Sequence, residues 1–90
     1  MPDTNTPTVT IYSTPMCAFC RTEKQWLDSL GVKFVTRDIE VDEGARDELL
    51  AKVNGDYRGV PTTDINGEII VGFDRPRLTA ALQANNLVAA

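Results

Sequence analysis

The chain has no histidine and only two cysteines among its 90 residues. A closed structural zinc site needs about four ligands, so no intrachain metal site is expected. Small secreted domains that depend on disulfides usually carry more cysteines, in pairs distant in the sequence. This cysteine usage therefore favours a reducing compartment, and a cytoplasmic location is the expectation.

Long apolar runs and clusters of basic residues are also missing. No stretch approaches the roughly 20 apolar residues of a membrane-spanning helix, and residues 1–7 lack the basic and apolar regions of a signal peptide. Nine Lys and Arg against 13 Asp and Glu give a formal net charge of −4, with no basic patch. Neither a membrane nor a nucleic acid is therefore an expected partner.

The composition that remains is that of a small globular protein. Hydrophobic residues make up 42% of the chain and charged residues 24%, which is too apolar for a disordered protein. A chain of this length supplies one compact core and not two. Residues 1–7, rich in Thr, Pro and Asn, are predicted to be a flexible tail, and residues 8–90 to form one domain.

Hydrophobic periodicity and turn residues predict the element order βαβαββα. Strands are expected over Thr8–Tyr12, Lys33–Ile39, Thr62–Ile65 and Glu68–Val71, and helices over about Ala18–Leu30, from a cap at Asp42 to about Val53, and from about Arg75–Pro76 to about Asn85. Asn66-Gly67 is a strong hairpin signal. A parallel first βαβ unit and a terminal hairpin predict an α/β fold, with a four-stranded mixed sheet flanked by three helices.

The two cysteines lie in the segment Cys17-Ala18-Phe19-Cys20, after the first predicted strand. If Cys20 opens the helix, Cys17 lies beside unpaired N–H groups, which stabilise a thiolate together with the helix dipole. A bridge across so short a loop removes little chain entropy, so it is a poor structural staple. The pattern favours a reversible dithiol/disulfide switch with Cys17 as nucleophile and Cys20 as resolving thiol, and the alternative is a pair of reduced structural thiols.

Three motifs together resemble the thioredoxin superfamily, specifically its glutaredoxin and NrdH-redoxin branch, over about residues 8–87. Residues 14–20 are similar to that branch's K/T-P-x-C-P-Y-C loop, although Ala18 replaces the usual proline and Thr14 the frequent lysine. Val60-Pro61-Thr62 lies where the family has a cis-proline facing the cysteines. Gly72-Phe73-Asp74 lies where glutaredoxins hold the γ-glutamyl end of glutathione and where NrdH-redoxins have a G-F-R-P motif.

The resemblance implies a thioredoxin fold and a thiol–disulfide oxidoreductase that needs no bound cofactor. Gly72-Phe73 and Arg75-Pro76 favour the NrdH-like branch, which is reduced by thioredoxin reductase with NADPH and serves ribonucleotide reductase. Arg58 and Asp74 keep open a glutaredoxin that acts with glutathione or another low-molecular-weight thiol. An alternative of another class is an iron–sulfur cluster shared by two subunits. The enzyme is expected to be a monomer that acts on protein disulfides.

The resemblance also implies roles for residues around the cysteines. With Pro61 in the cis form, the main chain of Val60 is placed to pair with an extended substrate. Arg58 either receives a substrate carboxylate or is an ordinary solvated loop residue. Asp74 either accepts an ammonium group or caps the last helix. Phe73 replaces the second glycine of the glutathione site, which argues against a tight glutathione pocket.

Three other aromatic residues remain to be assigned. Phe19 lies inside the reactive loop, and it either contributes to a docking surface for a protein partner or folds back onto the helix. Trp26 and Tyr12 have a spacing compatible with the core, so packing is the expected role of both.

Overall fold

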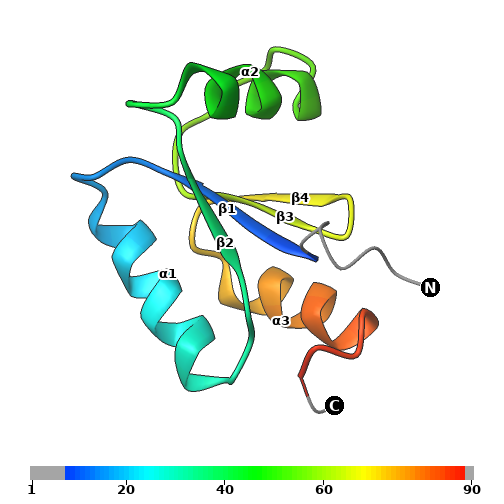
Figure 1. Ribbon diagram of the computed structural model, residues 1–90. Helices are drawn as coiled ribbons and strands as arrows, with labels where there is room; N and C mark the ends of the chain where they lie inside the picture. The colour runs from blue at the N-terminus through cyan, green and yellow to red at the C-terminus, as the bar shows by residue number, and fades with distance from the viewer. Residues whose placement is uncertain (1–7, 89–90) are drawn as a thin grey trace.

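The computed structural model describes residues 8–88 and contains the predicted elements in the predicted order (Figure 1). They are β1 (Val9–Ser13), α1 (Ala18–Ser29), β2 (Val35–Asp38), α2 (Glu43–Lys52), β3 (Thr62–Ile65), β4 (Glu68–Val71) and α3 (Arg75–Ala84). The predicted tail at residues 1–7 and the last two residues lie outside the described part.

The strands form one mixed sheet in the order β2-β1-β3-β4. β1 pairs in parallel with β2, with Thr10 opposite Val35, and antiparallel with β3, with Ile11 opposite Thr63. β3 and β4 form the antiparallel hairpin predicted from Asn66-Gly67. The α/β fold with a four-stranded mixed sheet and three helices is confirmed, and it is the thioredoxin fold that the resemblance implied.

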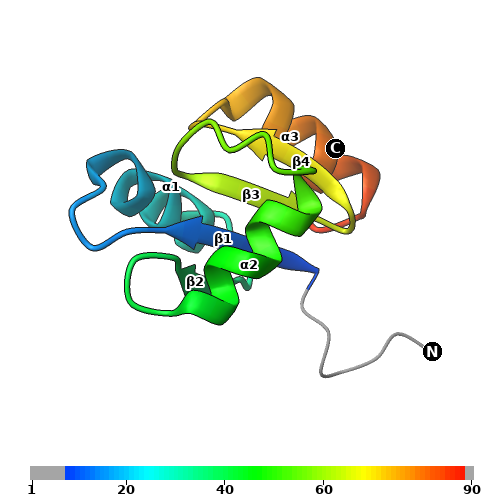
Figure 2. The same ribbon diagram turned by 90° about the horizontal axis from the view of Figure 1, so that it is seen from above.

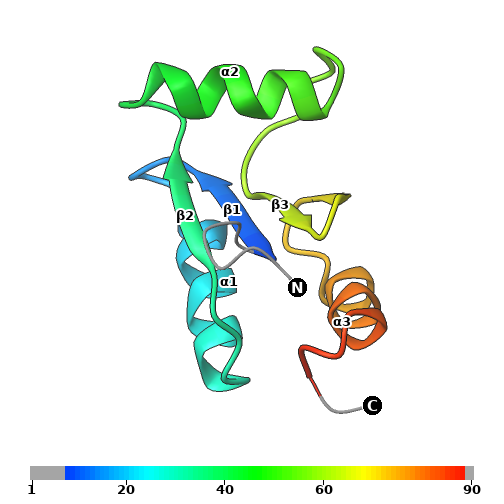
Figure 3. The ribbon, with the colours of Figure 1, turned by 45° about the vertical axis from the view of Figure 1, so that its right-hand side comes forward.

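The helices cover both faces of the sheet. Helices α1 and α3 lie on one face and α2 on the other (Figures 1 and 3), and from above α2 crosses over the middle strands (Figure 2). Strand residues alternate between the two layers. Ile11 packs in the cluster with Leu27 and Leu78 on the α1/α3 side, whereas Tyr12 packs with Leu49 on the α2 side.

The second strand is shorter than predicted. It was expected over Lys33–Ile39 but spans Val35–Asp38. Continuing its register with β1 would set Lys33 opposite Thr8, which lies outside β1, so Lys33 has no strand residue to pair with. At the other end, Ile39 N–H still donates to the Ser13 carbonyl at 3.0 Å, although Ile39 is not counted in the strand.

The packing roles predicted for Tyr12 and Trp26 are confirmed. Tyr12 is fully buried, and its hydroxyl donates to Glu48 Oε2 at 2.6 Å. Burial, followed by the hydrogen bond to Glu48, raises the pKa of Tyr12. Trp26 packs edge-on against Phe73 with ring centroids 5.8 Å apart, and the Arg75 guanidinium lies 5.3 Å from the indole centroid. These contacts join α1 to the segment that starts α3.

Candidate functional site

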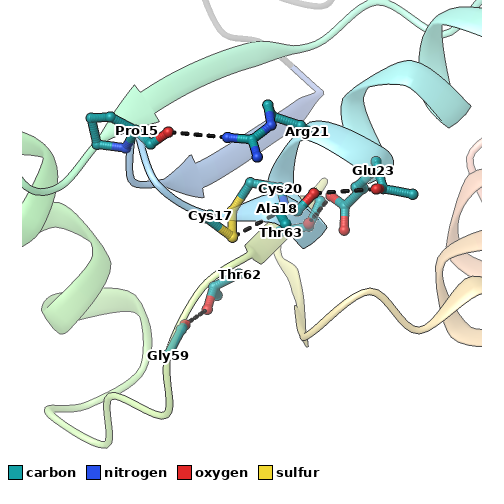
Figure 4. Close-up of a disulfide and its surroundings, with 10 residues drawn as sticks. Pro15, Cys17, Ala18, Cys20, Arg21, Glu23, Gly59, Thr62 and Thr63 are labelled. Atoms are coloured by element: carbon teal, nitrogen blue, oxygen red, sulfur yellow. Dashed lines mark hydrogen bonds between the residues drawn. A yellow bond between two sulfur atoms is a disulfide. The ribbon is translucent and has the colours of Figure 1, made fainter.

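The two cysteines lie at the start of α1 and are joined by a disulfide (Figure 4). After β1, Cys17 N–H closes a turn by donating to the Thr14 carbonyl at 3.3 Å. Cys17 is the N-cap of α1, and its Sγ accepts a hydrogen bond from the Cys20 main-chain N–H at 3.1 Å. The helix therefore directs one of its unpaired donors at the sulfur of Cys17, as the sequence predicted.

The two sulfurs have different surroundings. Cys17 is partly exposed, whereas Cys20 has no exposed surface. The first turn of α1 contains no acidic residue that would oppose the positive end of the helix dipole. Arg21 adds a positive charge in the next turn and donates to the Pro15 carbonyl at 3.3 Å. This asymmetry favours nucleophilic attack by Cys17 and intramolecular attack by Cys20.

After reduction, the Cys17 thiol is expected to ionise below the free-thiol value of about 8.5, and Cys20 above it, because only Cys17 caps the helix. Ultraviolet absorbance of the thiolate, followed against pH in Cys17→Ser and Cys20→Ser, measures each thiol separately. Arg21→Gln measures how much the nearby guanidinium contributes to the ionisation of the Cys17 thiol. A Cys17 that titrates like a free thiol would contradict its assignment as nucleophile.

The loop before β3 lies in the surroundings of the disulfide (Figure 4). The Val60–Pro61 peptide bond is cis, as the resemblance implied. The Pro61 carbonyl accepts a hydrogen bond from Gly72 N–H at 2.7 Å. This bond joins the motif that contains the cis-proline to the motif that begins at Gly72. Gly72 has a φ of 82°, in the left-handed region that favours glycine. Within residues 8–88 the main-chain groups of Val60 have no hydrogen-bonding partner, so they remain available to another chain.

Three residues in the region of a glutathione site make contacts within the chain instead. Asp74 caps α3, where its Oδ1 accepts from Arg77 N–H at 3.2 Å, so the capping alternative describes the structure. Arg58 forms an ion pair with Asp56 at 3.0 Å on the exposed loop. Phe73 packs against the core and Trp26.

The reactive loop presents apolar surface on both sides of Cys17. Met16 is 86% exposed and Phe19 67% exposed, so Phe19 does not fold back onto the helix. Exposed apolar side chains next to a reactive group are typical of a docking surface. They lie on the loop that would meet a substrate disulfide.

Sequence reasoning missed Glu23. This residue lies on the buried stripe of α1 between Cys20 and Leu27, and all three side chains are fully buried. The Thr63 hydroxyl donates to Glu23 Oε2 at 2.5 Å (Figure 4). Burial raises the pKa of Glu23, and the hydrogen bond from Thr63 lowers it in part. The signal was present in the sequence, since the i, i+3, i+7 spacing of Cys20, Glu23 and Leu27 gives one helix face.

A family model described as Glutaredoxin matches residues 9–70. The chain belongs to the glutaredoxin family. It is 35% identical to an uncharacterized glutaredoxin-like 8.6 kDa protein in a rubredoxin operon of Clostridium pasteurianum, over 83% of this chain and 97% of that protein.

Two solved structures are similar in fold to this chain. The thioredoxin-like protein BC3987 superposes with a TM-score of 0.75 at 30% identity, over 82% of this chain and 99% of that one. The NrdH-redoxin of Escherichia coli superposes with a TM-score of 0.66 over 91% of this chain and 96% of that one. At 22% identity, this second likeness shows the fold alone.

Membership of the glutaredoxin family, together with a bonded Cys17–Cys20 pair, supports thiol–disulfide oxidoreduction. No helix formed by residues 8–88 has both the length and the apolarity to span a membrane. In the same range, no three His, Cys, Asp or Glu side chains gather as a metal site would require.

Proposed function

We propose that this glutaredoxin-family chain is a dithiol electron donor that reduces protein disulfides, in the manner of an NrdH-redoxin. The observation that carries the proposal is the asymmetry of the cysteine pair. Cys17 caps α1 and is partly exposed, whereas Cys20 is buried one turn inside the helix. A disulfide joins the two sulfurs. Such a pair can attack a substrate with one sulfur and release it with the other.

The cycle transfers two electrons. The Cys17 thiolate attacks one sulfur of a substrate disulfide, forms a mixed disulfide, and expels the other sulfur as a thiolate, which takes a proton from water. Cys20 then loses its proton and attacks Cys17 Sγ, which expels the second substrate sulfur as a thiolate. The substrate leaves with two thiols, and the chain leaves with the Cys17–Cys20 disulfide. An external dithiol, or two molecules of an external monothiol, then reduces the Cys17–Cys20 disulfide and is itself oxidised to a disulfide.

Several contacts favour a protein substrate over glutathione. The side chains that would receive glutathione are engaged with the chain's own groups, Asp74 with the α3 N-terminus and Arg58 with Asp56. Phe73 is held against Trp26 in place of a second glycine. The unpaired main chain of Val60 and the exposed Phe19 instead suit an extended polypeptide laid across the cysteines.

The cellular setting is part of the same proposal. The chain acts as a monomer in the cytoplasm without a bound cofactor, takes electrons from NADPH through thioredoxin reductase, and delivers them to a protein such as ribonucleotide reductase. A glutathione-type thiol as the donor is the alternative, and one assay separates the two.

The test compares two reducing systems on one protein disulfide, with NADPH consumption as the readout. One contains thioredoxin reductase, and the other contains glutathione and glutathione reductase. Repeated turnover is expected with thioredoxin reductase and only background turnover with glutathione. Cys17→Ser is the control and should be inactive with both systems. Turnover sustained by glutathione alone would replace the proposed donor.

A further inference from the structure

The cycle above leaves one proton without a carrier. Cys20 is fully buried, so water does not reach the thiol that must be deprotonated before it attacks the mixed disulfide. The same sulfur needs a proton when the disulfide is reduced again. A group that accepts and returns this proton must therefore lie in the interior, close to Cys20.

Glu23 is the titratable side chain placed for this. It lies three residues after Cys20 on α1, and side chains at this spacing share a helix face with Cβ atoms about 5–6 Å apart. Both side chains are fully buried, and both belong to the surroundings of the disulfide drawn in Figure 4. The carboxyl group is thus inside the molecule, on the same face as the buried sulfur.

The hydrogen bonding of Glu23 is incomplete. One oxygen accepts from the Thr63 hydroxyl, but Oε1 is buried and has no hydrogen-bonding partner within residues 8–88. A buried polar atom without a hydrogen bond lowers the stability of a fold, because it has lost its contacts with water and gained none in exchange. Leucine or methionine at this position would extend the apolar stripe toward Leu27 without that cost. Packing alone therefore does not account for a glutamate here.

No charged group among residues 8–88 forms an ion pair with the buried carboxyl of Glu23. Strand alternation turns Ile11 and Thr63 toward α1, whereas Tyr12 and Asp64 face α2, where both interact with Lys52. On the side of α3, Arg75 lies over the Trp26 ring. Within residues 8–88 no ion pair includes Glu23, and burial raises its pKa. A carboxyl in such a site holds a proton more readily than an exposed one.

We infer that Glu23 is the internal acid–base group for Cys20, an inference that rests on the proposed dithiol function. In the mixed disulfide, the Glu23 carboxylate takes the proton of the Cys20 thiol. The resulting thiolate attacks Cys17 Sγ, the Cys17–Cys20 bond forms, and the substrate sulfur leaves with the electron pair. When an external thiolate later attacks Cys17 Sγ, Cys20 departs as a thiolate and recovers the proton from Glu23.

The two carboxyl states match the two redox states of the chain. In the disulfide form described here, protonated Glu23 places no net charge in the interior. In the dithiol form, a Glu23 carboxylate beside Cys20 raises the pKa of that thiol and keeps it protonated until a mixed disulfide forms. Thr63 is a positioning residue, because its hydroxyl holds the carboxyl through Oε2 and leaves Oε1 for the proton.

The test uses a symmetric nitroaryl disulfide whose halves become coloured when released. Mixing it with the reduced protein gives two phases, attack by Cys17 and then release of the second half by Cys20. In Glu23→Gln, the first phase should be unchanged and the second slower by about a hundredfold at neutral pH, the lower end of acid–base catalysis. Asp28→Asn, the same change on the exposed face of α1, is the matched control and should leave both phases unchanged.

The pH profile of the second phase supplies a readout that packing would not change. In the wild-type chain, this rate should fall as the pH drops through the pKa of Glu23, above the usual value near 4.3. The inflection should be absent from Glu23→Gln. Equal second phases in wild type and Glu23→Gln, or a wild-type profile without this inflection, would overturn the role of Glu23 alone. A wild-type chain without a first phase would overturn the dithiol function itself.

Discussion

Cys20→Ser is expected to lose steady-state reduction of protein disulfides, by about three orders of magnitude or more, as when a residue of a covalent mechanism is removed. The partly exposed Cys17 keeps its position at the α1 N-terminus and still attacks the substrate. A serine hydroxyl does not displace the substrate sulfur, so the variant should accumulate as a mixed disulfide with its substrate. Non-reducing electrophoresis and intact-mass measurement detect this adduct.

Cys17→Ser is the matched control for that trap. It removes the other sulfur of the same pair, so it should also lose turnover but should form no adduct, because the remaining thiol is fully buried. Glutathione-dependent turnover by Cys20→Ser would point to a cycle that needs only Cys17. That result would favour the glutaredoxin alternative over an NrdH-like donor.

Leu27→Ala is expected to lower the free energy of unfolding by about 2–5 kcal/mol, the range for a buried leucine cut back to alanine. Leu27 is fully buried in the cluster between α1, α3 and the sheet, so it fixes the helix that carries both cysteines. A domain of this size has roughly 5–15 kcal/mol of stability in total. Denaturant unfolding of the disulfide form measures the change.

Leu30→Ala makes the same chemical change at the C-cap of the same helix, where the side chain is 42% exposed. Its loss should be well below that of Leu27→Ala, because less apolar surface returns to water. Equal losses for the two variants would contradict the assignment of Leu27 to the cluster that anchors α1.

The sequence predicted the element order and most boundaries because the signals were local. Asn66-Gly67 gave the hairpin, Asp42 accepts from Ala45 N–H as the cap of α2, and Pro76 lies in the first turn of α3. The position of Cys17 at a helix N-terminus was predicted in the same way, because strand, turn and helix follow one another within a few residues. Capping and turn preferences need no information from the rest of the chain.

The features that sequence reasoning missed or left open depend on contacts between distant segments. The partner of Glu23 is Thr63, 40 residues later, so the burial of a glutamate was not evident from its own helix. The contact of Phe73 with Trp26 similarly joins α1 to the distant segment just before α3. Periodicity tells which face of an element is buried, but it does not tell which side chain meets it there.

The Trp26 contacts give the protein a built-in optical probe. Trp26 is the single tryptophan of the chain and lies on the helix that carries both cysteines. Its indole ring touches Phe73 and the Arg75 guanidinium, which flank the start of α3. Indole emission depends on such neighbours, so the intrinsic fluorescence of the unlabelled protein monitors the junction between α1 and α3. Rearrangement of that junction during reduction or partner docking would be visible in real time without an attached dye.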